Sequence, residues 1–216
     1  MHISNDRYFR DRQRHDLALR MIRHEARTHT IRSCTGLTDD RIRRLFKTFR
    51  SHTPAPLRRR RGKSPRQIAY FTRNPHMQFE ASYLSGVFAT FDLVRRQGTE
   101  VDAECLEYGQ RFCDAFETHR QLVQQPRISF EHAWFLLQLL NRGASLRAAR
   151  CRRCSGRYLR DRLHATARRC PFCELKALRR STEACAPTRS RRCRKANAQL
   201  RARGPASVSV PALLRP

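Results

Sequence analysis

Two pairs of cysteines constrain this chain more than any other feature. Two residues separate the members of each pair and fifteen residues separate the pairs, which are Cys151 with Cys154 and Cys170 with Cys173. A short turn lets each pair direct both sulfurs at one centre, so four thiolates at this spacing can enclose a zinc ion tetrahedrally. Four protein ligands leave no open position for water, so we expect one structural Zn²⁺ per chain. Disulfide bonding and chance clustering are the competing interpretations.

The excess of positive charge predicts a polyanionic partner. The chain has 46 Lys and Arg residues against 18 acidic residues, which gives a formal net charge of +28. Only four of these are lysines, and the planar guanidinium of arginine suits phosphate oxygens and guanine edges. A biased genomic base composition would explain the ratio of Arg to Lys but not the net charge. We therefore expect nucleic acid as the partner, ahead of an anionic membrane surface.

The compartment and the absence of catalysis follow from residue patterns. The sequence has no apolar run near 18 residues and no signal-peptide pattern at its charged N-terminus. Nine cysteines, an odd number, fit a reducing compartment better than a disulfide framework. We expect a soluble cytoplasmic protein that is not an enzyme, because its acidic residues are scattered rather than clustered for metal-dependent chemistry.

Residues 31–45 have the spacing of a helix-turn-helix. We expect residues 1–15 to be frayed and a first helix to start at Asp16; a second helix would then end at Gly36, and Thr38 would cap a third. The third helix would direct apolar residues inward and leave basic residues free as candidate DNA contacts. These candidates are Arg41, Arg44 and Lys47.

An ordinary helical hairpin is an equal alternative for this segment. Arg32 stands where helix-turn-helix motifs usually have a small residue for close packing. Asp39 and Asp40 would stabilise the helix dipole but repel phosphates at that end of the helix.

Residues 51–66 combine prolines, which prevent a regular helix, with the densest block of charge in the chain. Such a segment can follow a phosphate backbone or enter a narrow minor groove, and a solvated linker is the alternative. Further candidate contacts lie between the two cysteine pairs. The additional predicted DNA-binding residues are Arg58, Arg59, Arg60, Arg61, Arg152, Arg153 and Arg157.

The fold class predicted from these patterns is mostly α. Apolar periodicity predicts helices near residues 79–91, 102–126 and 129–143, of which the last is apolar nearly all round and should be the most buried or lie under a partner subunit. We expect a helical domain at 1–148 that binds DNA and a partner, and a small zinc-ribbon-like module at 149–176. A basic tail at 177–216 should be disordered after a short helix near 175–180.

The order of motifs along residues 12–180 resembles the FlhC family, the larger component of the bacterial flagellar master transcriptional regulator. The cysteine pairs and the segment from Tyr70 to Ser82 are the most specific parts of this resemblance. The matching motifs are Thr35-Gly36-Leu37, Arg41-Ile42-x-x-Leu45, Ser64-Pro65, Tyr70-Phe71-Thr72, His76 before Ala81-Ser82, the helix around Trp134, and Cys-x-x-Cys-x-Gly before the second Cys-x-x-Cys.

The resemblance implies a DNA-binding transcriptional activator. Members act with FlhD, a small helical partner, as an FlhD4FlhC2 hetero-hexamer on double-stranded promoter DNA upstream of flagellar (class II) operons, where they recruit RNA polymerase holoenzyme. Zinc on the four cysteines also follows from the family. This chain departs from the family in its high arginine content. The competing function is a sequence-nonspecific, zinc-containing nucleic-acid-binding protein.

Overall fold

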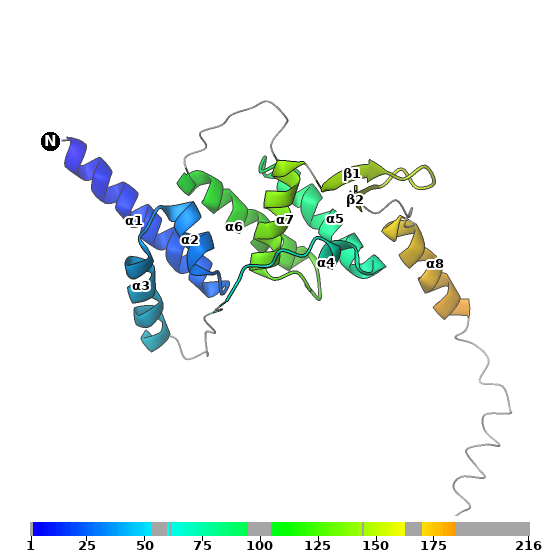
Figure 1. Cartoon of the computed structure of the whole chain (residues 1–216), viewed down its shortest axis with the longest axis horizontal. Helices are drawn as coiled ribbons and strands as arrows, with labels where there is room; N and C mark the ends of the chain where they lie inside the picture. The colour runs from blue at the N-terminus through cyan, green and yellow to red at the C-terminus, as the bar shows by residue number, and fades with distance from the viewer. Residues whose placement is uncertain are drawn as a thin grey trace, which may run out of the picture. The chain divides into compact units, whose positions relative to one another are not determined.

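The computed structural model describes residues 2–52, 60, 62–94, 105–143, 145–162 and 170–184. The chain divides into two compact units, Met1–Leu175 and Lys176–Pro216. Eight helices and one pair of strands make up the described residues, so the mostly α fold class is confirmed (Figure 1). No helix in these residues is long and apolar enough to cross a membrane.

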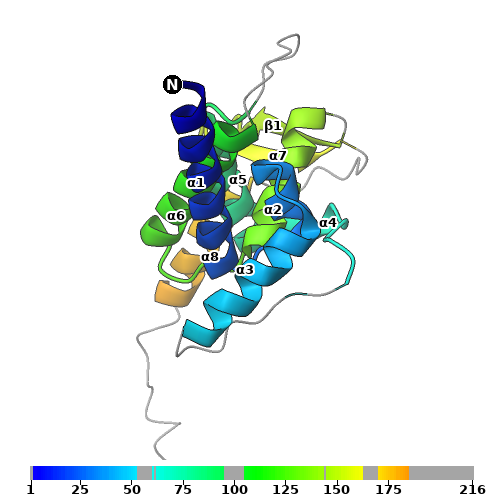
Figure 2. The same cartoon turned by 90° about the vertical axis from the view of Figure 1, so that its left-hand side faces the viewer.

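Helices α1 (His2–Arg23), α2 (Thr28–Thr35) and α3 (Asp39–His52) contact one another at the N-terminal end of the first unit (Figure 2). The expectation that residues 1–15 fray is wrong, because α1 begins at His2. Asp11 forms ion pairs with Arg14 (3.4 Å) and with Arg41 of α3 (3.7 Å), and these pairs stabilise the first half of α1.

The predicted turn between α2 and α3 is confirmed. Gly36 ends α2 with a φ of 68°, a left-handed conformation that favours glycine, and its N–H donates to the carbonyl of Arg32 at 2.9 Å. The Thr38 hydroxyl accepts from the N–H of Arg41 at 3.4 Å, as an N-cap does. Arg32 is exposed and pairs with Asp39 at 3.5 Å, so its size does not obstruct helix packing here.

Four helices form the centre of the first unit: α4 (Ala69–Thr72), α5 (Pro75–Thr90), α6 (Cys105–Leu122) and α7 (Phe130–Arg142). The last three confirm the helices predicted from periodicity. Ser129 caps α7 and Gly143 ends it in a left-handed conformation. Helix α7 buries one face, with Leu136 and Leu137 inaccessible and Trp134 half-buried.

Aromatic side chains join α6 to α7 in the core. Phe112 meets Phe130 at 5.0 Å and Trp134 at 4.9 Å between ring centroids, both edge to face. Phe116 contacts Phe130 in the same geometry at 5.1 Å. Edge-to-face pairs of this kind add about 0.5–1.5 kcal/mol each beyond the area they bury.

The antiparallel strands β1 (Leu146–Arg150) and β2 (Arg157–Asp161) follow, and α8 (Pro171–Ala184) comes last. Periodicity did not predict β1. Leu146 and Leu159 are buried in the same core as the helices. On α5, Gln78 donates to the carbonyl of Leu159 at 2.8 Å, and Ser82 accepts from its N–H at 2.9 Å. The strand pair is therefore hydrogen-bonded directly to the helical body.

Several sequence predictions fall outside the described residues. These are Arg58, Arg59 and Arg61 and most of the tail, 185–216. The short helix expected near residues 175–180 is present as part of α8. The division into 1–148, 149–176 and 177–216 stays a prediction.

Candidate metal centre and nucleic-acid interface

The first cysteine pair lies in the tight turn between β1 and β2. The N–H of Cys151 donates to the carbonyl of Gly156, and the N–H of Ser155 donates to the carbonyl of Cys151, both at 2.9 Å. A Cβ on Gly156 would lie 3.3 Å from the sulfur of Cys154 and from the ring of Phe172. Glycine at this position therefore lets the turn close against the second cysteine pair.

The second pair lies at the start of α8. Cys170 precedes Pro171, the first residue of the helix, and its carbonyl accepts from the N–H of Glu174 at 3.0 Å. Cys173 follows in the first turn of the helix. Phe172 packs edge to face on Phe79 of α5, with 5.1 Å between the centroids. Helix α5 thus supports both the strands and this pair.

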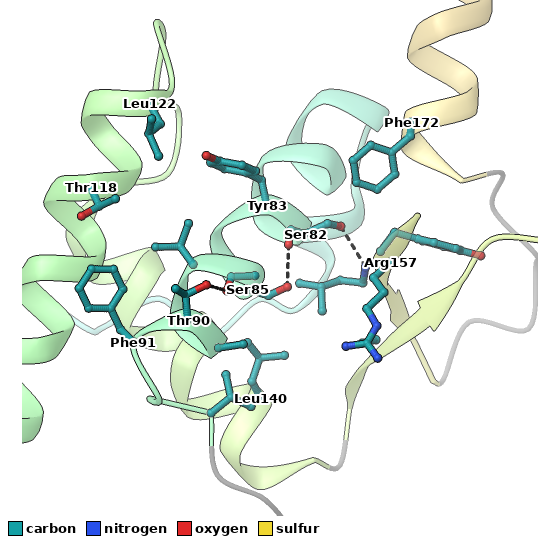
Figure 3. Close-up of a pocket in the computed structure, with 17 residues that line it drawn as sticks. Ser82, Tyr83, Ser85, Thr90, Phe91, Thr118, Leu122, Leu140, Arg157 and Phe172 are labelled. Carbon is teal, nitrogen blue, oxygen red and sulfur yellow. Dashed lines mark hydrogen bonds between the residues drawn. The ribbon is translucent and has the colours of Figure 1, made fainter. Parts of the chain in front are cut away.

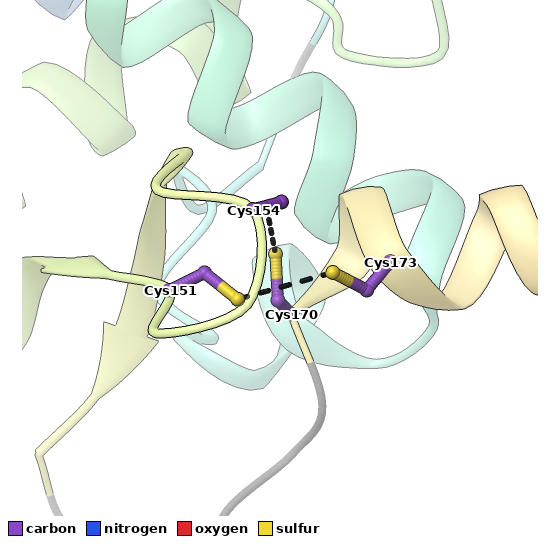
Figure 4. A group of neighbouring side chains, drawn as sticks. All are labelled: Cys151, Cys154, Cys170 and Cys173. Carbon is purple, nitrogen blue, oxygen red and sulfur yellow. Dashed lines mark hydrogen bonds between the residues drawn. The ribbon is translucent and has the colours of Figure 1, made fainter.

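The four sulfurs gather at one point (Figure 4). The sulfurs of Cys151 and Cys173 are 3.9 Å apart, those of Cys154 and Cys170 are 3.6 Å apart, and all four lie within 4.8 Å of one another. Zinc–sulfur bonds of about 2.3 Å in a regular tetrahedron place the sulfurs about 3.8 Å apart. These separations fit a metal centre and are far longer than a disulfide bond of about 2.0 Å.

The electrostatics of the cluster favour a cation. Hydrogen bonds from the backbone N–H groups of Cys154 and Arg153 lower the pKa of the Cys151 thiol to about 6. The contact with Cys154 and burial raise the pKa of Cys173 to about 12, and burial raises the pKa of Cys170. Thiolates this close repel one another, so four can ionise together only when a cation lies between them.

The arginines predicted around the cysteines lie on the surface. Arg152 and Arg153 occupy the turn of the first pair and Arg157 begins β2; all three are exposed. Because the turn is fixed by the strand pair and by α5, these guanidinium groups project from a rigid support.

The basic residues of α3 form a second group. Arg41, Arg44 and Lys47 are exposed, while Ile42 and Phe46 bury the opposite face. Asp11 partly neutralises Arg41, so Arg44 and Lys47 carry the less compensated charges among these three predicted contacts. In Figure 1, α3 and the β1–β2 turn lie far apart along the first unit, so the structure does not gather all predicted contacts on one element.

Arg60, from the basic segment at 51–66, lies against the connection between α1 and α2. It pairs with Glu25 at 2.8 Å. Burial lowers the pKa of His132, and so do the positive charges of Arg60, Arg27 and Arg73. Positive groups therefore converge on this corner of the helical body.

No spacing in the sequence marks His24 or His119 as a ligand or a catalytic group, but each has a carboxylate neighbour in the structure. His24 Nε2 lies 2.7 Å from Glu117, and His119, fully buried, lies 3.6 Å from Glu80. Both carboxylates are far from their histidines in sequence, so no local pattern could have revealed them. Among the described residues, only the four cysteines form a cluster of three or more potential metal ligands of these types.

An open apolar groove of about 650 Å³ borders the metal centre (Figure 3). Apolar and small side chains from α5, α6, α7 and both strands line it, and Leu122 at its edge is 61% exposed. Arg157 and Phe172 extend the lining toward the cysteines.

Comparison with known proteins places the chain in a class, the transcriptional regulators. The chain matches, over residues 4–186, the family model described as Flagellar transcriptional activator (FlhC). It therefore belongs to the FlhC family, which confirms the resemblance found in its motifs. Such regulators are typically not enzymes.

A relative supports the same assignment. The flagellar transcriptional regulator FlhC of Paraburkholderia atlantica is 24% identical over 180 residues, which cover 82% of this chain and 76% of that protein.

Proposed function

We propose that this chain is the DNA-binding subunit of a transcriptional activator that acts at promoters of flagellar (class II) operons. The observation that carries the proposal is the exposed basic face of α3, which follows the Gly36 turn in a chain of the FlhC family. Its remaining contacts to phosphate come from Arg152, Arg153 and Arg157, and from Arg58, Arg59 and Arg61 of the basic segment. Arginine at these positions supplies paired donors to phosphate oxygens.

The four cysteines hold Zn²⁺ in this proposal, one ion per chain. Bound metal supplies a crosslink between the turn after β1 and the start of α8, and it performs no chemistry on a substrate. The sulfur separations of 3.6 and 3.9 Å support this assignment. The crosslink keeps Arg152 and Arg153 in a fixed position relative to α5.

The chain acts in the cytoplasm with FlhD, as an FlhD4FlhC2 hetero-hexamer, and this complex recruits RNA polymerase holoenzyme. Family membership supports this partner. The groove along α5 supports a helical partner with an apolar face, because Val87, Phe91 and Leu140 lie in its lining and Arg157 is its only charged residue among those described.

Leu122→Glu should therefore reduce co-purification of FlhD, whereas Arg120→Gln, at an exposed position, should not. Equal recovery of FlhD with both variants would contradict the assignment of this surface.

The affinity ratio between promoter and random DNA tests the proposed function. Fluorescence anisotropy at one fixed salt concentration should give a ratio of about 10³ or more for the purified complex. A ratio near one would instead support the sequence-nonspecific nucleic-acid-binding protein.

Salt dependence tests the individual contacts. Each phosphate contact that is lost should reduce the slope of log affinity against log salt by about 0.9 on duplex DNA. We expect this reduction for Arg44→Gln, Lys47→Gln and Arg153→Gln. Arg120→Gln, on the exposed surface of α6, is the matched control and should leave the slope unchanged. An unchanged slope in one of the first three variants would remove that residue from the interface.

A further inference from the structure

Glu25 occupies a backbone conformation that glycine normally adopts. It follows the last turn of α1 with a φ of 57°. Its N–H donates to the carbonyl of Ile22 at 2.9 Å, and the N–H of Ala26 donates to that of Met21 at 3.0 Å. These two bonds form a Schellman helix end, in which the left-handed position usually belongs to glycine because a Cβ is strained there. Glutamate at this position is therefore less favourable for the backbone than glycine would be.

The carboxylate of Glu25 holds the basic segment. Arg60 Nε donates to the Oε2 atom of Glu25 at 2.9 Å, and its Nη2 lies 2.8 Å from the same oxygen in an ion pair. Arg27 lies two residues after Glu25, and Gly62 lies two residues after Arg60. Arg27 donates to the carbonyl of Gly62. Gly62 has a φ of 95°, which glycine adopts without strain. The connection between α1 and α2 thus binds the segment at residues 60 and 62.

An acidic group is needed at this corner because its other charged neighbours are mostly basic. The charges of Arg60, Arg27 and Arg73 all act on His132, and the Arg73 guanidinium lies 4.7 Å above the ring of Tyr70. Arg27 is partly offset by Glu131, whose carboxylate lies 3.7 Å away. Without Glu25, Arg60 would face like charges with no acidic partner shown for it among the described residues.

We propose that Glu25 is a positioning residue that anchors the basic segment to the α1–α2 connection, and that Arg60 is its anchor point rather than a phosphate ligand. The anchoring stands on the ion pair alone, whereas its consequence for DNA rests on the proposed function. The two contacts hold residues 60 and 62 at the α1–α2 connection.

Lys-C digestion of the full-length protein tests the anchoring without DNA. The chain has only four lysines, and cleavage after Lys63 reports on the segment next to the anchor. Glu25→Gly and Arg60→Gln should each speed cleavage at Lys63 about two- to fivefold, or about 0.4–1 kcal/mol at 1.4 kcal/mol per tenfold change. The double variant should be cleaved no faster than either single variant.

Asp92→Gly is the matched control. Asp92 ends α5 in the same way, with a φ of 53° and bonds from its own N–H to Ala89 (3.2 Å) and from Leu93 to Phe88 (2.9 Å). It makes no ion pair with the described residues. Both glycine substitutions remove the strain of a Cβ in the left-handed conformation, so neither should lower Tm. Only Glu25→Gly should change cleavage at Lys63. Wild-type cleavage in Glu25→Gly, or equal acceleration in Asp92→Gly, would overturn the anchoring.

Binding of the purified complex to a fluorescein-labelled flagellar promoter duplex tests the role of Arg60. Arg60→Gln should keep the wild-type slope of log affinity against log salt, since no phosphate contact is lost. A slope reduced by about 0.9 would show that Arg60 contacts a phosphate and would refute its role as an anchor only. If the wild-type protein does not bind the duplex, the proposed function fails, and the digestion still decides whether Glu25 anchors the segment.

Discussion

Replacing Glu117 by glutamine should release an ion-pair cluster that joins α1 to α6. Arg20 donates to both oxygens of the Glu117 carboxylate, at 2.8 and 2.7 Å, and to Asp114 at 2.6 Å. His24 lies 2.7 Å from the same carboxylate. The hydrogen bonds from Arg20, followed by that from His24, lower the pKa of Glu117 from 4.5 to about 2 against the opposing effect of burial.

The magnitude follows from this pKa. A decrease from 4.5 to about 2 corresponds, at 1.36 kcal/mol per unit, to an upper limit of about 3 kcal/mol. The side chain is 33% exposed, and solvent screening reduces the expected value to about 1–2 kcal/mol. Because the folded-state pKa is the lower one, this stabilisation is present above about pH 4.5 and is lost as the pH falls through about 2.

Urea unfolding followed by circular dichroism measures the effect. Glu117→Gln should lower the free energy of unfolding by about 1–2 kcal/mol at neutral pH, and its difference from wild type should shrink toward pH 2. Glu107→Gln is the control on the same helix, because Glu107 is 66% exposed and lies 3.8 Å from Arg111; it should cost no more than about 0.5 kcal/mol. A difference that persists undiminished at about pH 2, or an equal loss in the control, would refute the assigned role of the carboxylate.

Three further substitutions test the metal centre, the attachment of the strands and the start of α2. Cys151→Ser should abolish stoichiometric zinc in metal analysis by mass spectrometry, whereas Cys113→Ala, in the core, should retain it; a full complement of zinc in Cys151→Ser would contradict the assignment. Ser82→Ala leaves the buried N–H of Leu159 without its acceptor and should cost about 1–3 kcal/mol in urea unfolding, so wild-type stability would show that the strands do not depend on this bond. Glu131→Gln removes a buried negative charge from the N-terminus of α2 and should lower the free energy of unfolding by about 1–2 kcal/mol, and an unchanged Tm would exclude that role.

Predictions that depend on neighbouring residues succeeded. Gly36 and Gly143 end their helices in the left-handed conformation, and Ser129 caps α7, because these signals act within one helical turn. The expectation of a frayed N-terminus also depended on neighbouring residues only, and it is wrong. Residues 1–15 lack a strong apolar face, and α1 is stabilised there by ion pairs, one of which joins Asp11 to Arg41 on α3.

By itself, the sequence determined the set of four cysteines that cluster, the main helices, the turn after α2 and the strong positive charge, since each is expressed in composition or short-range spacing. Tertiary structure alone decided which distant groups meet. Leu159 bonds to Ser82 across 77 residues, and Glu25 holds Arg60 across 35. Such pairs arise because the hydrophobic core brings α5, the strands and the α1–α2 connection together, and polar groups at its edge must then satisfy one another. No periodicity in the chain encodes those contacts.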